Sequence, residues 1–194
     1  MELTERFDLA LQVASGLHRD PMRKGTDIPY MAHLMAVSAL VIEDGGTEDE
    51  AIAGLLHDAV EDQGGSATLE QISDEFGEPV AALVAAVSDT DQTPKPPWRE
   101  RKEEYFVHLE AANSSVLRVS AADKLHNARS ILLDFRVVGD ALWDRFNAPM
   151  PDQVWYYRSL ADIFNRRLGS PLSAELRRTV DELELAVGVR GIEA

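Results

Sequence analysis

Apolar side chains recur every three or four residues along most of this chain, which is the period of an amphipathic helix. The first segment shows the pattern with Leu3, Phe7, Leu11, Ala14 and Leu17 on one face. Strict apolar–polar alternation, the pattern of a half-buried strand, is nearly absent. The chain is therefore predicted to be all-α, with helices at about 3–19, 30–43, 47–63, 68–76, 79–88, 99–111, 115–135, 152–168 and 172–187.

Cap and turn residues support these boundaries. Thr47 and Glu50 have the spacing of a capping box, the glycines at 64–65 end that helix, and Thr68 is expected to open a second box. Residues 89–98 contain three prolines and are predicted to be a loop. No segment has the composition of a linker, so residues 1–194 are expected to form a single domain, a helical bundle. Its core is expected at about 5–168 and its C-terminal helix at about 172–187, followed by a frayed tail.

The composition narrows the classes of function. The 194 residues are 45% hydrophobic and 27% charged, which is typical of a globular protein, and they include no cysteine. Disulfides, zinc–thiolate sites and a cysteine nucleophile are therefore excluded. No apolar run approaches the roughly 18 residues that span a bilayer, and the N-terminus lacks the features of a leader peptide. A cytoplasmic protein without a membrane partner is expected.

The net charge of −15 makes a nucleic-acid partner unexpected, because binding to a phosphate backbone requires a basic surface. A small phosphorylated ligand remains compatible with this charge, since a metal ion and a few local cations can reverse the sign inside a pocket. The charge leaves the oligomeric state open.

The most informative stretch is residues 55–62, in which His57, Asp58, Glu61 and Asp62 stand among apolar residues. On a continuous helix, His57 would share a face with Glu61, and Asp58 with Asp62. Burying one imidazole and three carboxylates without partners would cost about 1–3 kcal/mol or more per group. A bound cation would remove most of this cost, and this mixture of donors suits a divalent ion such as Mn, Fe or Zn.

Three further polar segments lie on or beside apolar helices. They are His33, Asp123 with Asn127 four residues later, and the Arg23-Lys24 pair just before the His33 helix. Each has an ordinary explanation when taken alone. His33 could be a hydrogen-bonded core residue, Asp123 could pair with Lys124 or Arg129, and Glu61 with Asp62 could be a solvated helix end. Together, two imidazoles and two carboxylates are enough to hold one divalent ion with positions left for water and substrate.

These segments resemble the HD-domain metal-dependent phosphohydrolases. More narrowly, they resemble the hydrolase domain of RelA/SpoT-type alarmone enzymes and the stand-alone small alarmone hydrolases related to SpoT in metazoans. The similarity rests on Arg23–Thr26 with Pro29–His33, on Leu55–Asp62, and on Ala122–Arg129, which together cover about residues 5–135.

The resemblance implies a role for each of these residues. A manganese ion would be bound by His33, His57, Asp58 and Asp123. Glu61 and Asp62 would position and deprotonate the attacking water. The guanine base and phosphates of a nucleotide would contact Arg23 and Lys24, and the ribose side would contact Asn127, with Ser130 on the next turn.

The implied activity is hydrolysis of ppGpp or pppGpp at the 3′ position, with pyrophosphate as a product. Two alternatives stay open. The first is another HD-domain nucleotide phosphohydrolase, acting on a nucleoside monophosphate or on an adenine alarmone. The second is a non-catalytic nucleotide-binding protein that keeps the fold. The carboxylates of Glu61 and Asp62 favour catalysis, and Arg23 with Lys24 favours a polyphosphorylated purine nucleotide.

Overall fold

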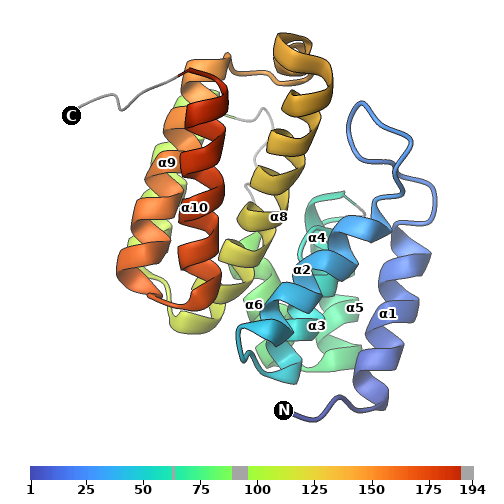
Figure 1. Cartoon of the computed structure of the whole chain (residues 1–194). Helices are drawn as coiled ribbons and strands as arrows, with labels where there is room; N and C mark the ends of the chain where they lie inside the picture. Colours follow the sequence, from blue (N-terminus) through green and yellow to red (C-terminus); the bar gives the residue numbers. More distant parts are fainter. Residues whose placement is uncertain (63, 89–95, 189–194) are drawn as a thin grey trace.

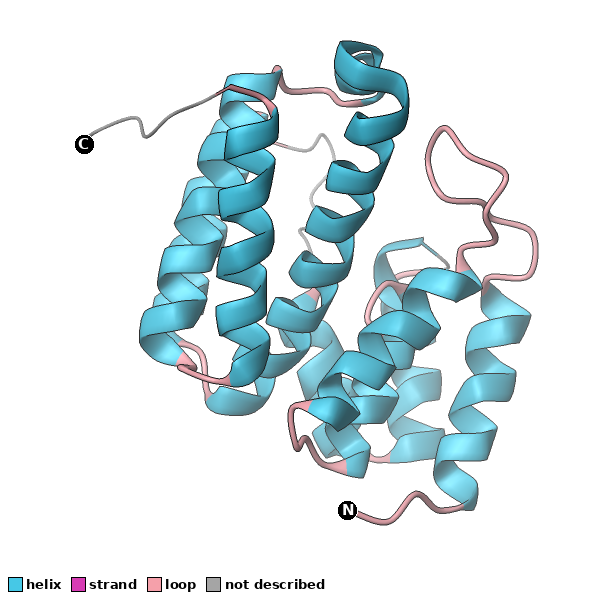
Figure 2. Cartoon of the chain, in the orientation of Figure 1, coloured by secondary structure: helices cyan, strands magenta, loops and turns pink. Residues whose placement is uncertain are grey.

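The computed structural model describes residues 1–62, 64–88 and 96–188. Within these ranges the protein is a bundle of helices without a strand (Figure 2), which confirms the all-α prediction. The helices are α1 Glu5–Leu17, α2 Met31–Glu43, α3 Glu48–Leu56, α4 Ala59–Asp62, α5 Ser66–Phe76, α6 Glu78–Val87, α7 Trp98–Ala111, α8 Ser114–Val138, α9 Met150–Arg167 and α10 Pro171–Ala186, and a 3-10 helix, η1, covers Gly139–Arg145. No helix in the described part of the chain is both long and apolar enough to cross a membrane.

The 25-residue helix α8 connects the two sides of the bundle. Its C-terminal half runs beside α9 and α10, and its N-terminal half leads to the group formed by α2, α3 and α6 (Figure 1). Asn113 caps its first turn by accepting a hydrogen bond from the Val116 amide at 3.0 Å, and Gly139, with φ +60°, ends it. The largest fully buried side chains come from both sides and include Leu34, Leu55, Leu117, Leu125, Leu160, Phe164 and Leu176.

Helices α2 and α3 approach each other closely. The backbone of Gly54 faces α2 so closely that a Cβ atom there would lie 3.1 Å from the Cα of Ser38. The Ser38 hydroxyl also donates to the Ala51 carbonyl at 2.8 Å, which ties the two helices together. This close packing sets the positions of His33 on α2 and His57 just after α3.

The expectation of one continuous helix through the His57-Asp58 pair is wrong. Helix α3 ends at Leu56, α4 begins at Ala59, and the two residues lie in the turn between them. The His57 ring provides the reason, because its Nδ1 contacts the Gly54 carbonyl oxygen at 2.9 Å, which a continuous helix would use for the Asp58 amide. The His57 carbonyl in turn accepts a hydrogen bond from the Ser88 hydroxyl at 3.3 Å.

Two predicted helix starts have different outcomes. The capping box at Thr47 is confirmed, with the Thr47 amide donating to the Glu50 carboxylate at 2.8 Å and the Glu50 amide donating to the Thr47 hydroxyl at 3.3 Å. The box at Thr68 is wrong, because α5 already begins at Ser66 after Gly65, which has φ +62°. Most of the predicted proline-rich loop (89–95) and the tail (189–194) lie outside the described residues.

Candidate metal centre and adjoining cavity

Four of the predicted site residues converge from three parts of the chain: α2, the turn after α3, and α8. Donor atoms of His33, His57 and Asp58 all lie within 4.8 Å of one another. Asp123 completes the group, with its Oδ1 at 3.3 Å from His33 Nε2 and 3.8 Å from His57 Nε2. Both imidazoles and Asp123 are buried, and Asp58 is half-buried. His33, His57, Asp58 and Asp123 together form a four-residue cluster.

The donor set of the four-residue cluster fits a divalent metal ion. Ligands about 2.1 Å from a shared ion are separated from one another by about 3–4 Å, and the distances from His33 Nε2 and His57 Nε2 to the two carboxylates run from 3.0 to 3.8 Å. The buried His57 Nε2 has no partner in hydrogen-bond geometry among the described residues, although Asp58 Oδ2 lies 3.0 Å away. Its Nδ1 is engaged by the Gly54 carbonyl, which leaves a lone pair on Nε2 for a cation.

The electrostatics of the cluster also call for positive charge. Burial lowers the pKa of His57, but the Asp58 and Asp123 carboxylates outweigh burial and raise it to about 10. Burial raises the pKa of Asp58, but His57 and His33 hold it well below its usual range. Without a cation the cluster therefore retains a proton on an imidazole, and a divalent ion would supply that positive charge instead.

Neighbouring side chains hold these donors in place. The Tyr30 hydroxyl donates to Asp58 Oδ2 at 2.5 Å, and His33 Nδ1 lies 2.8 Å from His126 Nδ1. Asp123 accepts hydrogen bonds from Asn127 on Oδ1 at 2.5 Å and from Lys124 on Oδ2 at 2.6 Å. Such partners fix the direction of a ligand's lone pairs and are typical of metal centres.

The two predicted water-activating residues, Glu61 and Asp62, belong to the short helix that follows His57 and Asp58. Glu61 lies on the short helix α4, one turn after His57, and its side chain is exposed. The backbone of Asp62 ends the same helix, and its side chain lies outside the described part of the structure. Their roles stay predictions.

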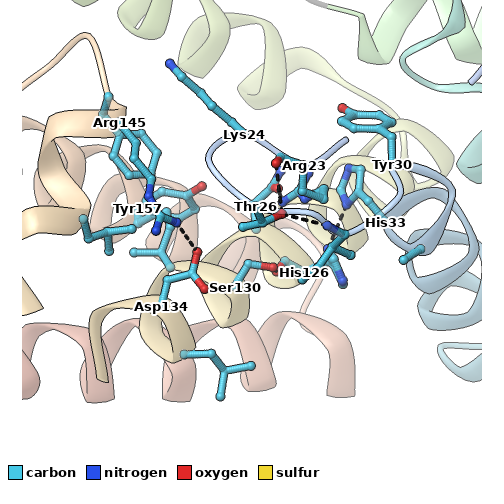
Figure 3. A pocket seen from close by; sticks show the side chains of 17 residues that line it. Arg23, Lys24, Thr26, Tyr30, His33, His126, Ser130, Asp134, Arg145 and Tyr157 are labelled. Carbon is cyan, nitrogen blue, oxygen red and sulfur yellow. Dashed lines mark hydrogen bonds and ion pairs between the residues drawn. The ribbon is translucent and has the colours of Figure 1, made fainter. Parts of the chain in front are cut away.

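A cavity of about 550 Å³ adjoins the cluster on the side of His33. The four predicted substrate residues, Arg23, Lys24, Asn127 and Ser130, all line it. Arg23, Lys24 and Ser130 can be followed in Figure 3. Arg23 comes from the loop between α1 and α2, and its Nη2 donates to the Asn127 Oδ1 at 2.6 Å. Asn127 therefore links a cation at the cavity wall to Asp123 of the cluster.

Sequence reasoning missed several residues of this region. Tyr30 and His126 lie in the segments that resemble the HD-domain family, but nothing in their spacing identified them as partners of Asp58 and His33. Asp134 and Arg145 line the far end of the cavity, as does the buried Tyr157 of α9. Residues beyond 135 therefore contribute to this cavity.

Comparison with known proteins supports a family assignment. A model of the HD domain family matches residues 10–138. A probable GTP pyrophosphokinase of Mycobacterium leprae is 36% identical over 123 residues, which are 63% of this chain and 15% of that protein. The chain thus spans a small part of that relative. The guanosine-3′,5′-bis(diphosphate) 3′-pyrophosphohydrolase MESH1 of Xenopus tropicalis is 34% identical over 125 residues, which are 63% of this chain and 67% of that protein.

The fold is also found among solved structures. A metazoan ortholog of SpoT, described as hydrolysing ppGpp, superposes with a TM-score of 0.72 at 23% identity, over 98% of this chain and 99% of that one. The protein lmo0812 of Listeria monocytogenes superposes with a TM-score of 0.69 at 28% identity, over 80% and 99% of the two chains. These structures share the fold, and the family match with the identity to MESH1 confirms the resemblance found in the sequence: the chain belongs to the HD domain family, together with MESH1.

Proposed function

We propose that this protein hydrolyses ppGpp and pppGpp at the 3′ position, forming GDP or GTP and pyrophosphate, with one manganese ion held by the four-residue cluster. The observation that carries the proposal is the junction of that cluster with a cavity lined by Arg23 and Lys24. The similarity to MESH1, which is named for this reaction, supports the choice of substrate. A nucleotide substrate of this kind is consistent with a cytoplasmic location and a part in the stringent response.

Hydrolysis of a pyrophosphate ester requires neutralised phosphoryl oxygens and an aligned water molecule. A divalent ion in the cluster would supply charge neutralisation and lower the pKa of a bound water. The chain itself supplies the geometry, because Tyr30, His126 and Asn127 each hold one of the cluster's donors through a short contact. We assign proton removal from the water to Glu61 and Asp62, which follow the cluster on α4.

In this proposal the cations that line the cavity bind the nucleotide. A chain with a net charge of −15 repels a polyphosphate at long range, so local positive charge is needed. Arg23 offers a planar guanidinium that can stack on a purine, and it lies 5.6 Å from the centre of the Tyr30 ring. Lys24 is exposed at the cavity and supplies a point charge for phosphate.

The direct test is incubation with ppGpp and Mn²⁺, with the products separated by chromatography. GDP and pyrophosphate in equal amounts are expected, and a chelator should stop the reaction. Lys24→Ala should raise KM more than it lowers kcat, because this residue lies away from the scissile bond. The matched control is Arg136→Ala. Arg136 lies elsewhere on α8, and its substitution removes an exposed ion pair with Glu182 of α10. Faster cleavage of GMP than of ppGpp would instead support a nucleoside monophosphate phosphohydrolase.

A further inference from the structure

The wall of the cavity farthest from the cluster is built by a segment that follows the family match. The HD domain match ends at residue 138, and η1, Gly139–Arg145, begins at the next residue. Leu142 and Arg145 of η1 and the following Phe146 all line the cavity. A row of aromatic rings packs this segment against the end of α8. The ring centroid of Trp143 lies 5.8 Å from that of Phe135 and 6.0 Å from that of Phe146.

One face of α8 connects the two ends of the cavity. Asn127, Ser130, Ile131 and Asp134 line it with the spacing of a single helix face, and Asp123 stands one turn before them. With a rise of about 1.5 Å per residue, Asp134 lies about 16 Å along the helix from Asp123. Figure 3 shows the same order, with Asp134 and Arg145 at one end and His33 at the other. A nucleotide with its scissile phosphate at the cluster would extend toward Asp134 and Arg145.

These two side chains form an ion pair at the cavity. Arg145 Nη1 donates to Asp134 Oδ2 at 2.8 Å, and the two side chains are 24% and 36% exposed. The shaft of Arg145 packs on the backbone of Gly25, where a Cβ atom would lie 2.7 Å from its Cδ and where φ is +73°. The position of Arg145 is therefore fixed by α8 on one side and by the Arg23-Lys24 loop on the other.

We infer that the Asp134–Arg145 pair recognises the guanine base of the substrate by its hydrogen-bonding edge. This inference rests on the proposed function and specifies its substrate. Guanine presents an acceptor, O6, beside two donors, N1–H and the N2 amine. The pair presents an arginine donor beside a carboxylate that accepts two hydrogen bonds, so the two patterns are complementary. Adenine would instead place the lone pair of its N1 against the carboxylate.

The surroundings favour a base over a phosphate at this end. The charges of Asp134 and Arg145 cancel, and the carboxylate would repel a phosphate oxygen. Ile131, Leu142 and Phe146 add apolar surface, which suits the faces of a purine ring. Among the described residues, Arg23 and Lys24 have no carboxylate at ion-pair distance. Lys24 therefore remains available for phosphate, and Arg23 for the face of the base.

The test compares guanine and adenine substrates in variants that preserve shape. The ratio of kcat/KM for ppGpp to that for its adenine counterpart is measured in the wild type, Asp134→Asn, Arg145→Lys and the control Arg136→Ala. The wild type should prefer guanine, and Asp134→Asn should reduce this preference by about 10- to 100-fold. Arg145→Lys should reduce it less, and Arg136→Ala should leave it unchanged. Metal content should be the same in all four proteins.

A binding experiment separates this inference from the proposed function. Calorimetry with GDP and ADP measures the preference for the base without turnover. A guanine preference that is lost in Asp134→Asn, together with absent hydrolysis, would contradict the proposed function and keep the inference. Hydrolysis of ppGpp by a wild type that does not prefer guanine, or by an Asp134→Asn variant with the wild-type preference, would overturn the inference. A merely structural ion pair would change stability and leave the ratio unaltered.

Discussion

Each candidate metal ligand also contacts a second polar group that fixes its orientation. In the described structure these partners are His126 for His33, the Gly54 carbonyl for His57, Tyr30 for Asp58, and Asn127 for Asp123. A ligand constrained in this way loses little freedom when it binds an ion, which raises affinity and fixes the geometry of the centre. Asn127 makes two contacts: it donates a hydrogen bond to Asp123 and accepts one from Arg23 at the cavity wall.

Glu61→Gln and Asp62→Asn test the assignment of the water-activating carboxylates. Both substitutions nearly preserve shape and remove a base, so each should lower kcat by roughly 10²–10⁴ while the bound metal stays at the wild-type level. Steady-state kinetics with metal analysis of the same samples gives both quantities. Wild-type turnover in both variants would assign these carboxylates to a solvated helix end.

His126 should make stability depend on pH. Burial, followed by its neighbours His33 and Arg23, lowers the pKa of His126 from 6.5 to about 4. The unfolded chain takes up this proton at a higher pH than the folded one. The contribution of His126 is therefore fully present above pH 6.5 and is lost as the pH falls toward 4, by about 2 kcal/mol at pH 5.

The measurement is denaturant unfolding of the chelator-treated protein at pH 7.5 and pH 5, for the wild type and His126→Gln. The wild type should lose more of its free energy of unfolding on acidification than the variant does. Equal losses in the two proteins would show that His126 does not carry this dependence.

At the scale of elements, the cluster depends on how closely α2 and α3 pack. Gly54→Ala would place a methyl group 3.1 Å from the Cα of Ser38, which is backbone and cannot move aside cheaply. The two helices must separate, so we expect a loss of stability of about 1–3 kcal/mol and weaker metal binding, because His33 and His57 move apart. Thermal unfolding and metal titration measure the two effects.

Gly16→Ala is the matched control, since Gly16 also lies in a helix but a Cβ atom there has nothing within 4 Å. This variant should keep its metal affinity and gain up to about 1 kcal/mol of stability. Gly54→Ala with the stability and metal affinity of the wild type would contradict the close packing of α2 and α3.

Most helices could be predicted from the sequence, because they carry a clear apolar period and ordinary caps. The turn at His57 could not, because it depends on a side chain that occupies the Gly54 carbonyl. η1 could not be predicted either, since its position follows from aromatic contacts such as that of Trp143 with Phe135. The candidate ligands were predictable as polar residues in apolar segments, whereas their partners and the far end of the cavity required the tertiary structure.

At the scale of the molecule, a strongly acidic chain encloses a site that needs cations. The formal charge is −15, yet the cavity beside the cluster is lined by Arg23, Lys24 and Arg145, against the single carboxylate of Asp134 among its described lining residues. The α1–α2 loop supplies Arg23 and Lys24, and η1 supplies Arg145. The fold thus brings distant segments together to make a local field opposite in sign to that of the whole protein.

The central claim is that the four-residue cluster binds one divalent ion. The most direct measurement is the metal content of protein purified without chelator and reloaded with Mn²⁺, for the wild type, Asp123→Ala and the exposed-carboxylate control Asp8→Ala. We expect about one equivalent in the wild type and the control, and loss of the ion from Asp123→Ala with its helical content unchanged, because one anionic ligand is gone. Full metal content and activity in Asp123→Ala would contradict the ligand set.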